Sequence, residues 1–218
     1  MPITQAALAL VAIVGVTSPD RPASTATGPQ SSTPDAVQTA ADLGRILGSD
    51  KAKVWLLIAS DFQCPFCRQW HSDTWEQIRA EYVSTGKIRV AYVHLPLGQH
   101  PNARPTAIAS MCASAQGKFW PMADRIFRTQ DQWKDLADPW PLLESLGRAV
   151  GVDAAKFRAC RAHPGIGALV EGDRVRMGRA GAASTPTFFI GARRLEGALP
   201  MAEFRRVIDA ELAASGGR

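Results

Sequence analysis

Short apolar runs and amphipathic segments alternate along the chain beyond residue 35. The run Lys53–Ala59 (KVWLLIA) is almost wholly apolar and predicts a buried strand. Apolar residues at helical spacing follow it as far as Gly86, and Ile88–Leu95 (IRVAYVHL), rich in β-branched and aromatic residues, predicts a second strand. The order strand, helix, strand predicts a β-α-β unit.

The middle of the chain is predicted to be helical. The candidate helices are Arg104–Gln116, Lys118–Thr129, Pro141–Val150, Asp153–Cys160 and Gly165–Gly178. After them, Thr185–Gly197 is expected to form two short strands around a turn at Gly191. Pro200–Ala213 has apolar residues at helical spacing and predicts a closing amphipathic helix. Together these patterns predict an α/β fold with a helical insertion.

The N-terminal residues have a different composition. Ala6–Val16 is a run of 11 residues without a polar side chain. As a helix it would span about 16 Å, too short for a bilayer core of about 30 Å, and it fits the apolar core of a secretory signal. No Lys or Arg precedes it, so a weak anchor is the alternative. Thr17–Pro34, with four prolines and many Ser and Thr, is predicted to be a linker.

Composition and charge narrow the class of protein. The 218 residues, 46% hydrophobic and 21% charged, fit a soluble globular protein of one domain, or of one domain with an insertion. The net charge is +5, but eight arginines are interleaved with six acids from Glu171 to Arg218. Interleaved charges indicate a solvated mixed surface, so no nucleic-acid partner is expected.

Two cysteines lie close together in the stretch SDFQCPFCRQW, directly after the first predicted strand. Proline is favoured at the first position of a helix, so Pro65 places Cys64 at a helix start. Zinc needs four ligands, usually in two close pairs, and one pair with a nearby His71 is incomplete; no metal site is expected. A structural disulfide across so short a loop would remove little chain entropy.

Redox chemistry explains the spacing best. At a helix N-cap, the sulfur of Cys64 meets free backbone N–H groups and the positive end of the helix dipole, which favour the nucleophilic thiolate. Cys67 lies one turn later on the same face and can close a disulfide with it. Cys64 is therefore predicted to be the nucleophile and Cys67 the resolving thiol. The exchange needs no bound cofactor.

Four stretches of the chain resemble the DsbA-like branch of the thioredoxin superfamily. They are SDFQCPFCRQWH, the HLPL that ends the second strand, ASAQGKFWPMADRIF and STPTFFIG, spread over roughly Gly44–Ala213. The resemblance implies a thioredoxin-like fold with an inserted helical domain. The expected parts are 1–36, signal or anchor plus linker; 37–97, the first thioredoxin half; 98–178, the helical insertion; and 179–218, the second half.

The same resemblance assigns further site residues. Pro186 is expected to be cis and packed against the cysteine pair, with Thr185 turned outward to pair with an extended substrate segment. Pro65 and Phe66 are expected to complete the substrate surface. Cys112 and Cys160 are expected to form a structural disulfide; the alternative is two small buried thiols.

One feature of the family is absent from the sequence. Relatives often carry a buried acid six residues before the first cysteine, where this chain has Ile58. Asp61 is the nearest acid in sequence and is expected past the strand end, closer to solvent. Cys67 is then predicted to be buried in an apolar setting with a high pKa. His71, His94 and His100 are not expected to be catalytic.

These residues predict an exported bacterial thiol-disulfide oxidoreductase, an oxidase of extracytoplasmic proteins. Its expected substrates are unfolded or partly folded exported proteins, and the resemblance implies a membrane redox partner. We expect a monomer. The resemblance implies that an isomerase would usually carry a dimerisation domain, and none is visible. The alternatives are a thiol reductase or isomerase, and a non-catalytic binding module or chaperone that keeps the thioredoxin fold.

Overall fold

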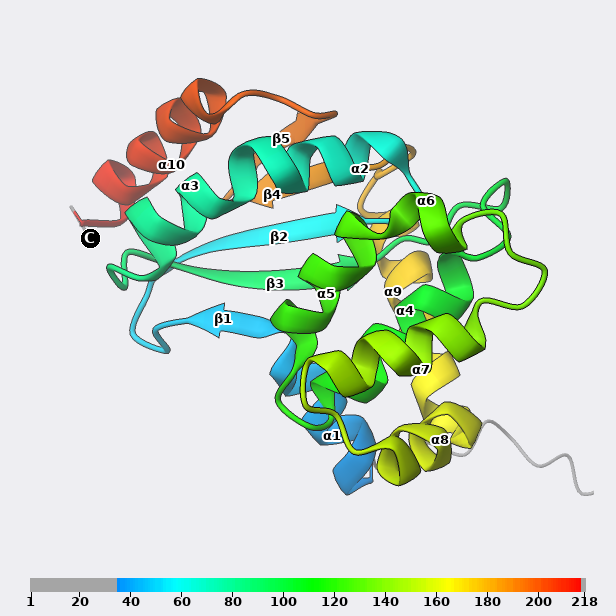
Figure 1. The fold of residues 1–218 in the computed structure, drawn as a ribbon. Helices are drawn as coiled ribbons and strands as arrows, with labels where there is room; N and C mark the ends of the chain where they lie inside the picture. The colour runs from blue at the N-terminus through cyan, green and yellow to red at the C-terminus, as the bar shows by residue number, and fades with distance from the viewer. Residues whose placement is uncertain (1–34, 217–218) are drawn as a thin grey trace, which may run out of the picture. The chain divides into compact units, whose positions relative to one another are not determined.

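The computed structural model describes residues 35–216; the predicted signal, anchor and linker positions before residue 35 lie outside the described residues. A five-stranded mixed sheet forms the centre, in the order β1-β3-β2-β4-β5 (Figure 1). Its central strands β2 and β3 are parallel, and the other pairs are antiparallel. The strands are β1 (Ile46–Gly48), β2 (Val54–Ser60), β3 (Ile88–His94), β4 (Thr187–Ile190) and β5 (Arg193–Glu196).

Helices connect and cover these strands. A continuous helix with two π-type turns links β2 to β3, six helices lie between β3 and β4, and α10 closes the fold. The elements are α1 (Ala36–Gly44), α2 (Pro65–Trp70), η1 (His71–Trp75), α3 (Glu76–Ile78), η2 (Arg79–Val83), α4 (Ala103–Ser114), α5 (Phe119–Arg128), α6 (Gln130–Trp133), α7 (Trp140–Ala149), α8 (Ala154–Ala162), α9 (Pro164–Arg179) and α10 (Met201–Gly216). The predicted thioredoxin-like fold with a helical insertion is confirmed.

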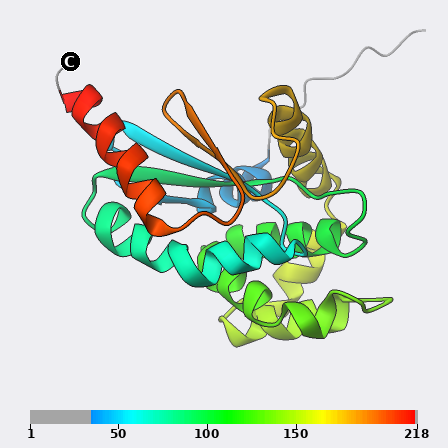
Figure 2. The same ribbon diagram turned by 90° about the horizontal axis from the view of Figure 1, so that it is seen from above.

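Both faces of the central strands are covered, which explains the nearly continuous apolar sequence of β2. Leu56 and Ile58 point into the main core, which also contains Phe204 of α10. Ala59 belongs to a second apolar cluster with Met177 of α9. Figure 2 shows α10 and α9 on opposite sides of the strands. The sheet therefore holds the end of β2, where the cysteine pair follows, between two packed layers.

The elements at the start of the described chain were not predicted from the sequence. Asp35 caps α1 through a capping box: its side chain accepts from the Gln38 N–H while the Gln38 side chain accepts from the Asp35 N–H. Asp followed three residues later by Gln is a readable helix-start signal. The strand β1 has only three residues, too few for an apolar pattern. The short helix α6 was missed for the same reason.

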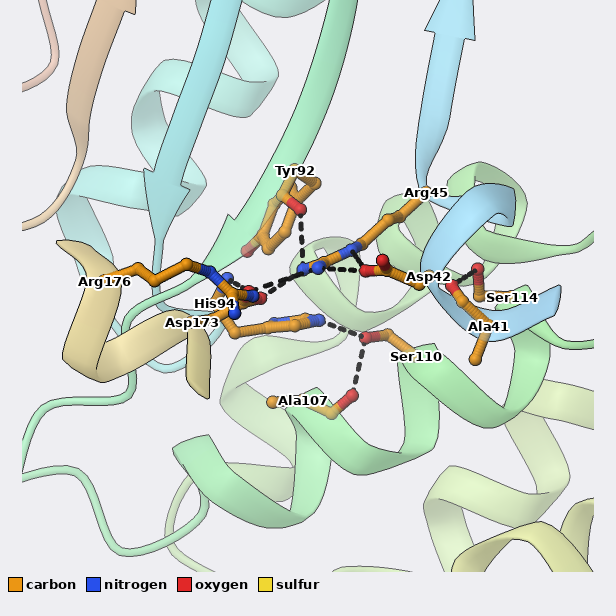
Figure 3. A network of polar contacts seen from close by, with 10 residues as sticks. All are labelled: Ala41, Asp42, Arg45, Tyr92, His94, Ala107, Ser110, Ser114, Asp173 and Arg176. Carbon is orange, nitrogen blue, oxygen red and sulfur yellow. Dashed lines mark hydrogen bonds and ion pairs between the residues drawn. The ribbon is translucent and has the colours of Figure 1, made fainter. Parts of the chain in front are cut away.

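A buried polar network ties α1, β3 and α9 together (Figure 3). Arg45, 6% exposed, forms an ion pair with the fully buried Asp173 and donates to the Tyr92 carbonyl at 3.1 Å. Asp173 also accepts the His94 N–H at 2.9 Å. Burial alone raises the pKa of Asp173, but the hydrogen bond and charge of Arg45 outweigh it and hold that pKa below its ordinary value. Burial lowers the pKa of His94 to about 3, so its imidazole is neutral.

Cys112 of α4 and Cys160 of α8 are joined in the structure, with an S–S distance of 2.04 Å. The two residues are 48 positions apart and both are buried. The bond links two helices of the segment between β3 and β4, far in sequence from the free thiols Cys64 and Cys67.

Replacing Cys112 and Cys160 with alanine should lower the free energy of unfolding by about 2–4 kcal/mol. A cross-link that closes a loop of this length restricts the unfolded chain by up to ~4 kcal/mol. Urea denaturation without reductant measures the difference, and wild-type protein in reductant is the control. An unchanged free energy of unfolding, with both thiols free by mass spectrometry of the wild type, would contradict the expectation.

Candidate active site

Cys64 occupies the N-cap of α2, directly beyond the turn that follows β2. Its N–H donates to the Asp61 carbonyl at 3.2 Å, and its own carbonyl accepts the Arg68 N–H at 3.2 Å. Pro65 takes the first helical position, where its missing N–H costs nothing. The β2 strand and the proline together fix the cysteine at an open helix start, as the sequence predicts.

The thiol of Cys64 is buried, at 4% exposure, yet its thiolate is favoured. Its pKa is lowered to about 6, first because the Cys67 thiol can donate a hydrogen bond to it, which outweighs the opposing effect of burial. The Thr185 hydroxyl and the backbone N–H groups of Cys67 and Phe66 favour the thiolate further. Cys64 is therefore poised to act as a nucleophile at neutral pH.

Cys67 has the opposite character. It is completely buried in the main core, and burial raises its pKa well above the ordinary value. The neighbouring Cys64 thiolate raises it further, while the Asp61 N–H, which donates to its Sγ at 3.5 Å, lowers it. The prediction of a buried Cys67 with a high pKa is confirmed. Ile58 is fully buried as well.

The loop before β4 approaches the cysteine pair. The Thr185–Pro186 peptide bond is cis, as the resemblance implies. The Cys64 thiol donates to the Thr185 carbonyl at 3.4 Å, although the two residues are 121 positions apart. Thr185 and Pro186 are both buried, so the expectation that Thr185 is turned outward is wrong for its side chain. The structure thus brings the predicted residues of this loop to Cys64.

The rim of the site is formed by the first turn of α2. Pro65 is exposed, and the large apolar side chain of Phe66 is 59% exposed. Arg68 forms an ion pair with Asp131 at 2.6 Å. Arg68 follows Cys67 directly in the sequence, but Asp131 balances its charge.

Two glutamines that the sequence did not single out hold the loop between β2 and α2 in place. Gln130 Nε2 donates to the carbonyls of Phe62 (2.7 Å) and Cys64 (3.2 Å). Gln63 Nε2 donates to the Lys134 carbonyl at 2.9 Å. A glutamine in a short helix carries no recognisable sequence signal, because its partners lie more than 60 residues away. These hydrogen bonds fix the loop to α6 and to the turn that follows α6.

The expectation that Asp61 lies closer to solvent is wrong. The residue is 2% exposed, and its carboxylate accepts the N–H groups of Gln63 (2.8 Å) and Leu97 (2.9 Å) and contacts His100 Nδ1 at 2.7 Å. It lies past the end of β2, as expected, but the loop after β3 covers it. Burial raises its pKa, although these hydrogen bonds oppose the rise.

No group of three or more His, Cys, Asp or Glu side chains within residues 35–216 is arranged to hold a metal ion. Nor is any helix in this range both long and apolar enough to cross a membrane.

A family model described as thioredoxin matches residues 41–210, which include both cysteines, the cis-proline loop and the helices between them. The chain belongs to the thioredoxin family. Among solved structures, alpha-DsbA1 from Wolbachia pipientis matches with a TM-score of 0.70 at 22% identity, over 78% of this chain and 91% of that one. Within the thioredoxin family, the fold is therefore DsbA-like.

Two curated relatives add to the comparison. The Na(+)/H(+) antiporter NhaA of Herminiimonas arsenicoxydans is 30% identical over 169 residues, which are 78% of this chain and 26% of the antiporter. A probable disulfide bond formation protein D from Bacillus anthracis is 29% identical over 85 residues, 38% of this chain and 39% of that protein. This thioredoxin-family chain spans about a quarter of the length of the antiporters that it matches.

Proposed function

We propose that this chain is a protein thiol-disulfide oxidoreductase in which Cys64 is the nucleophile and Cys67 the resolving thiol. The observation that carries the proposal is the contrast between the two thiols. The pKa of Cys64 is lowered to about 6, while that of its buried neighbour Cys67 is raised. Two adjacent groups with pKa values pushed in opposite directions are typical of divided chemical roles.

The reaction is a pair of thiol-disulfide exchanges. The Cys64 thiolate attacks a substrate disulfide, forms a mixed disulfide and releases one substrate thiolate. Cys67, after losing its proton, attacks the Cys64 sulfur; the Cys64–Cys67 disulfide forms and the second substrate thiolate leaves. Run backward, the same two steps oxidise a substrate dithiol and return both cysteines to the reduced form.

The surroundings of Cys64 support a polypeptide substrate. The Thr185 backbone pairs with an extended substrate segment, as an added strand would, next to the sulfur. The exposed Phe66 and Pro65 offer apolar contact to a partly folded chain. We infer that the substrates are unfolded or partly folded exported proteins, that the enzyme acts outside the cytoplasm as a monomer, and that a membrane protein restores its redox state.

The direction of exchange is inferred from the thiolate. Interactions that lower the pKa of Cys64 stabilise the reduced form of the pair, which makes the disulfide a stronger oxidant. This favours an oxidase over a reductase or isomerase. The name of the Bacillus anthracis relative, a disulfide bond formation protein, is consistent with that direction. A non-catalytic binding module would have no need of a thiol with a lowered pKa.

Two assays of purified protein test the proposal. Oxidised protein should introduce a disulfide into a dithiol peptide, and reduced protein should reduce insulin slowly. Equilibration with glutathione should give a Cys64–Cys67 potential well above that of a reductase such as thioredoxin, about −270 mV. A potential near or below that value would contradict the oxidase role. No exchange in either assay would contradict the oxidoreductase itself.

Phe66→His is expected to strengthen the oxidant. Phe66 gives Cys64 no charge and no side-chain donor, whereas a histidine can supply both. The pKa of Cys64 should fall by about one unit, and the potential should rise by about 30 mV. Thiolate absorbance and glutathione equilibration measure the two quantities. Phe66→Leu, which adds neither charge nor donor, is the control; an unchanged or higher Cys64 pKa in Phe66→His would contradict the expectation.

A further inference from the structure

Asp61 is the buried acid nearest in sequence to the cysteine pair, and every one of its polar groups is engaged. Its side chain is 0% exposed. One carboxylate oxygen accepts the Gln63 N–H, and the other accepts the Leu97 N–H and meets His100 Nδ1. Because a carboxylate only accepts hydrogen bonds, Nδ1 is the protonated nitrogen of the His100 ring.

The backbone of Asp61 contacts both cysteines. Its N–H donates to Cys67 Sγ at 3.5 Å, and its carbonyl accepts the Cys64 N–H at 3.2 Å. The hydrogen bonds of the Asp61 side chain thus hold in place the peptide groups whose N–H and carbonyl contact the two cysteines. Through Leu97 and His100 it also ties this loop to the loop that follows β3.

A neutral amide could not replace this carboxylate. Three donors point at its two oxygens, whereas an asparagine has one acceptor oxygen and an NH₂ group that donates. Whichever way the side chain of an Asp61→Asn variant turned, its NH₂ would face the N–H of Gln63 or of Leu97. One buried N–H would lose its partner, and the loop would have to move.

We propose that Asp61, paired with His100, is a positioning residue that aims the Asp61 N–H at the Cys67 sulfur and so sets the rate at which Cys67 acts as attacking or leaving thiolate. This rests on the proposed oxidoreductase function. Ile58 is apolar and fully buried, and Asp61 is the residue directly after β2.

The step concerned is the same in both directions of exchange. In oxidation, a substrate thiolate attacks Cys64 of the Cys64–Cys67 disulfide; a substrate–Cys64 bond forms, the Cys64–Cys67 bond breaks, and Cys67 leaves with the electron pair. In reduction, the Cys67 thiolate attacks the mixed disulfide and the substrate thiolate leaves. In each case a completely buried sulfur carries the charge, and the Asp61 N–H is the backbone donor that contacts it.

Other titratable groups lie around the carboxylate. His100 faces it from the loop after β3, and the two cysteines from α2 and its N-cap. Tyr92 of β3 lies on the sheet side: burial raises its pKa, and the charges of Cys67 and Asp61 raise it further. Among the described residues, His100 is the only group in contact with the Asp61 carboxylate that can carry a positive charge.

The test separates the two chemical steps. In Asp61→Asn, rapid quenching should show that the mixed disulfide with a model peptide resolves about tenfold more slowly, the effect of losing one hydrogen bond to a charged group. Formation of the mixed disulfide, measured in the Cys67→Ser background, should change less than about twofold. Asp73→Asn, the same change at an exposed acid of η1, is the matched control and should leave both steps unchanged.

Two outcomes would overturn the proposal: resolution at the wild-type rate in Asp61→Asn, or an equal slowing of both steps, which would indicate general disruption of the loop. If the wild type itself exchanges no disulfides, the proposed function fails instead.

A second variant serves if Asp61→Asn does not fold. Removing the hydrogen bond and charge of His100 raises the pKa of Asp61 further, so the carboxyl takes up a proton, and loses an acceptor, at higher pH. The ratio of wild-type to His100→Ala resolution rates should therefore fall toward one as the pH rises. A ratio that does not change with pH would contradict the role of the pair.

Discussion

Cys64→Ser is expected to lower the rate of disulfide exchange by about a thousandfold or more. A serine hydroxyl keeps its proton at neutral pH, whereas the Cys64 thiol, with a pKa of about 6, is mostly ionised. The variant should keep the stability of the reduced wild type, because serine nearly matches cysteine in size. Peptide oxidation and insulin reduction measure the loss.

Cys67→Ser should behave differently. Cys64 can still attack, but no second thiol resolves the product, so mixed disulfides should accumulate and survive acid quenching. Peptide mapping should place every adduct on Cys64. Adducts on Cys67 in the Cys64→Ser variant, formed at a comparable rate, would reverse the assignment of the two roles.

Arg45→Met is expected to lower the free energy of unfolding by about 3–5 kcal/mol. The substitution leaves the fully buried Asp173 with only the exposed Arg176 as an ion-pair partner, and a poorly compensated buried charge is strongly destabilising. Urea denaturation at neutral pH measures the loss. Arg79→Met, which removes an exposed ion pair with Glu76, is the matched control and should cost less than about 1 kcal/mol.

A double variant separates the charge from the packing. In Arg45→Met with Asp173→Leu, both charges are gone, and most of the lost stability should return. A double variant no more stable than Arg45→Met would show that packing around Arg45, rather than the unpaired carboxylate, explains the loss.

The same ion pair makes stability depend on pH. The folded-state pKa of Asp173 lies below its ordinary value, so the contribution is complete above the unfolded pKa of about 3.9 and is lost as the pH falls through the lower, folded value. In Arg45→Met the His94 N–H still lowers the pKa of Asp173, but the larger effect of Arg45 is gone and burial raises that pKa, so this contribution should shrink.

Local patterns in the sequence were enough to predict the elements that carry the redox pair. β2, the helix start at Pro65 and β3 are each encoded by adjacent residues. The turn at Gly191, which has a positive φ of 56°, is marked by a glycine directly after the apolar run of β4. The cis bond before Pro186 was predicted from family resemblance, since sequence alone gives any X-Pro bond only about a 5% chance of being cis.

Contacts between distant segments could not be predicted in this way. Asp61 was expected near solvent because it follows a strand end, but the loop that buries it comes from 36 to 39 residues later. The ion pair between Arg45 and Asp173 spans 128 residues, and neither residue stands out in its local sequence. Whether a polar residue is buried depends on the segments that pack over it, and its neighbours in the sequence do not show which segments those are.

The ionisation of Cys64 tests the central claim most directly. Thiolate absorbance of the reduced protein, followed as the pH is raised, should show one transition with a pKa of about 6 that disappears in Cys64→Ser, while Cys67 stays protonated well beyond it. A Cys64 that titrates near the ordinary thiol pKa of about 8.5 would contradict the account, because the helix start and Cys67 would then give the nucleophile no advantage.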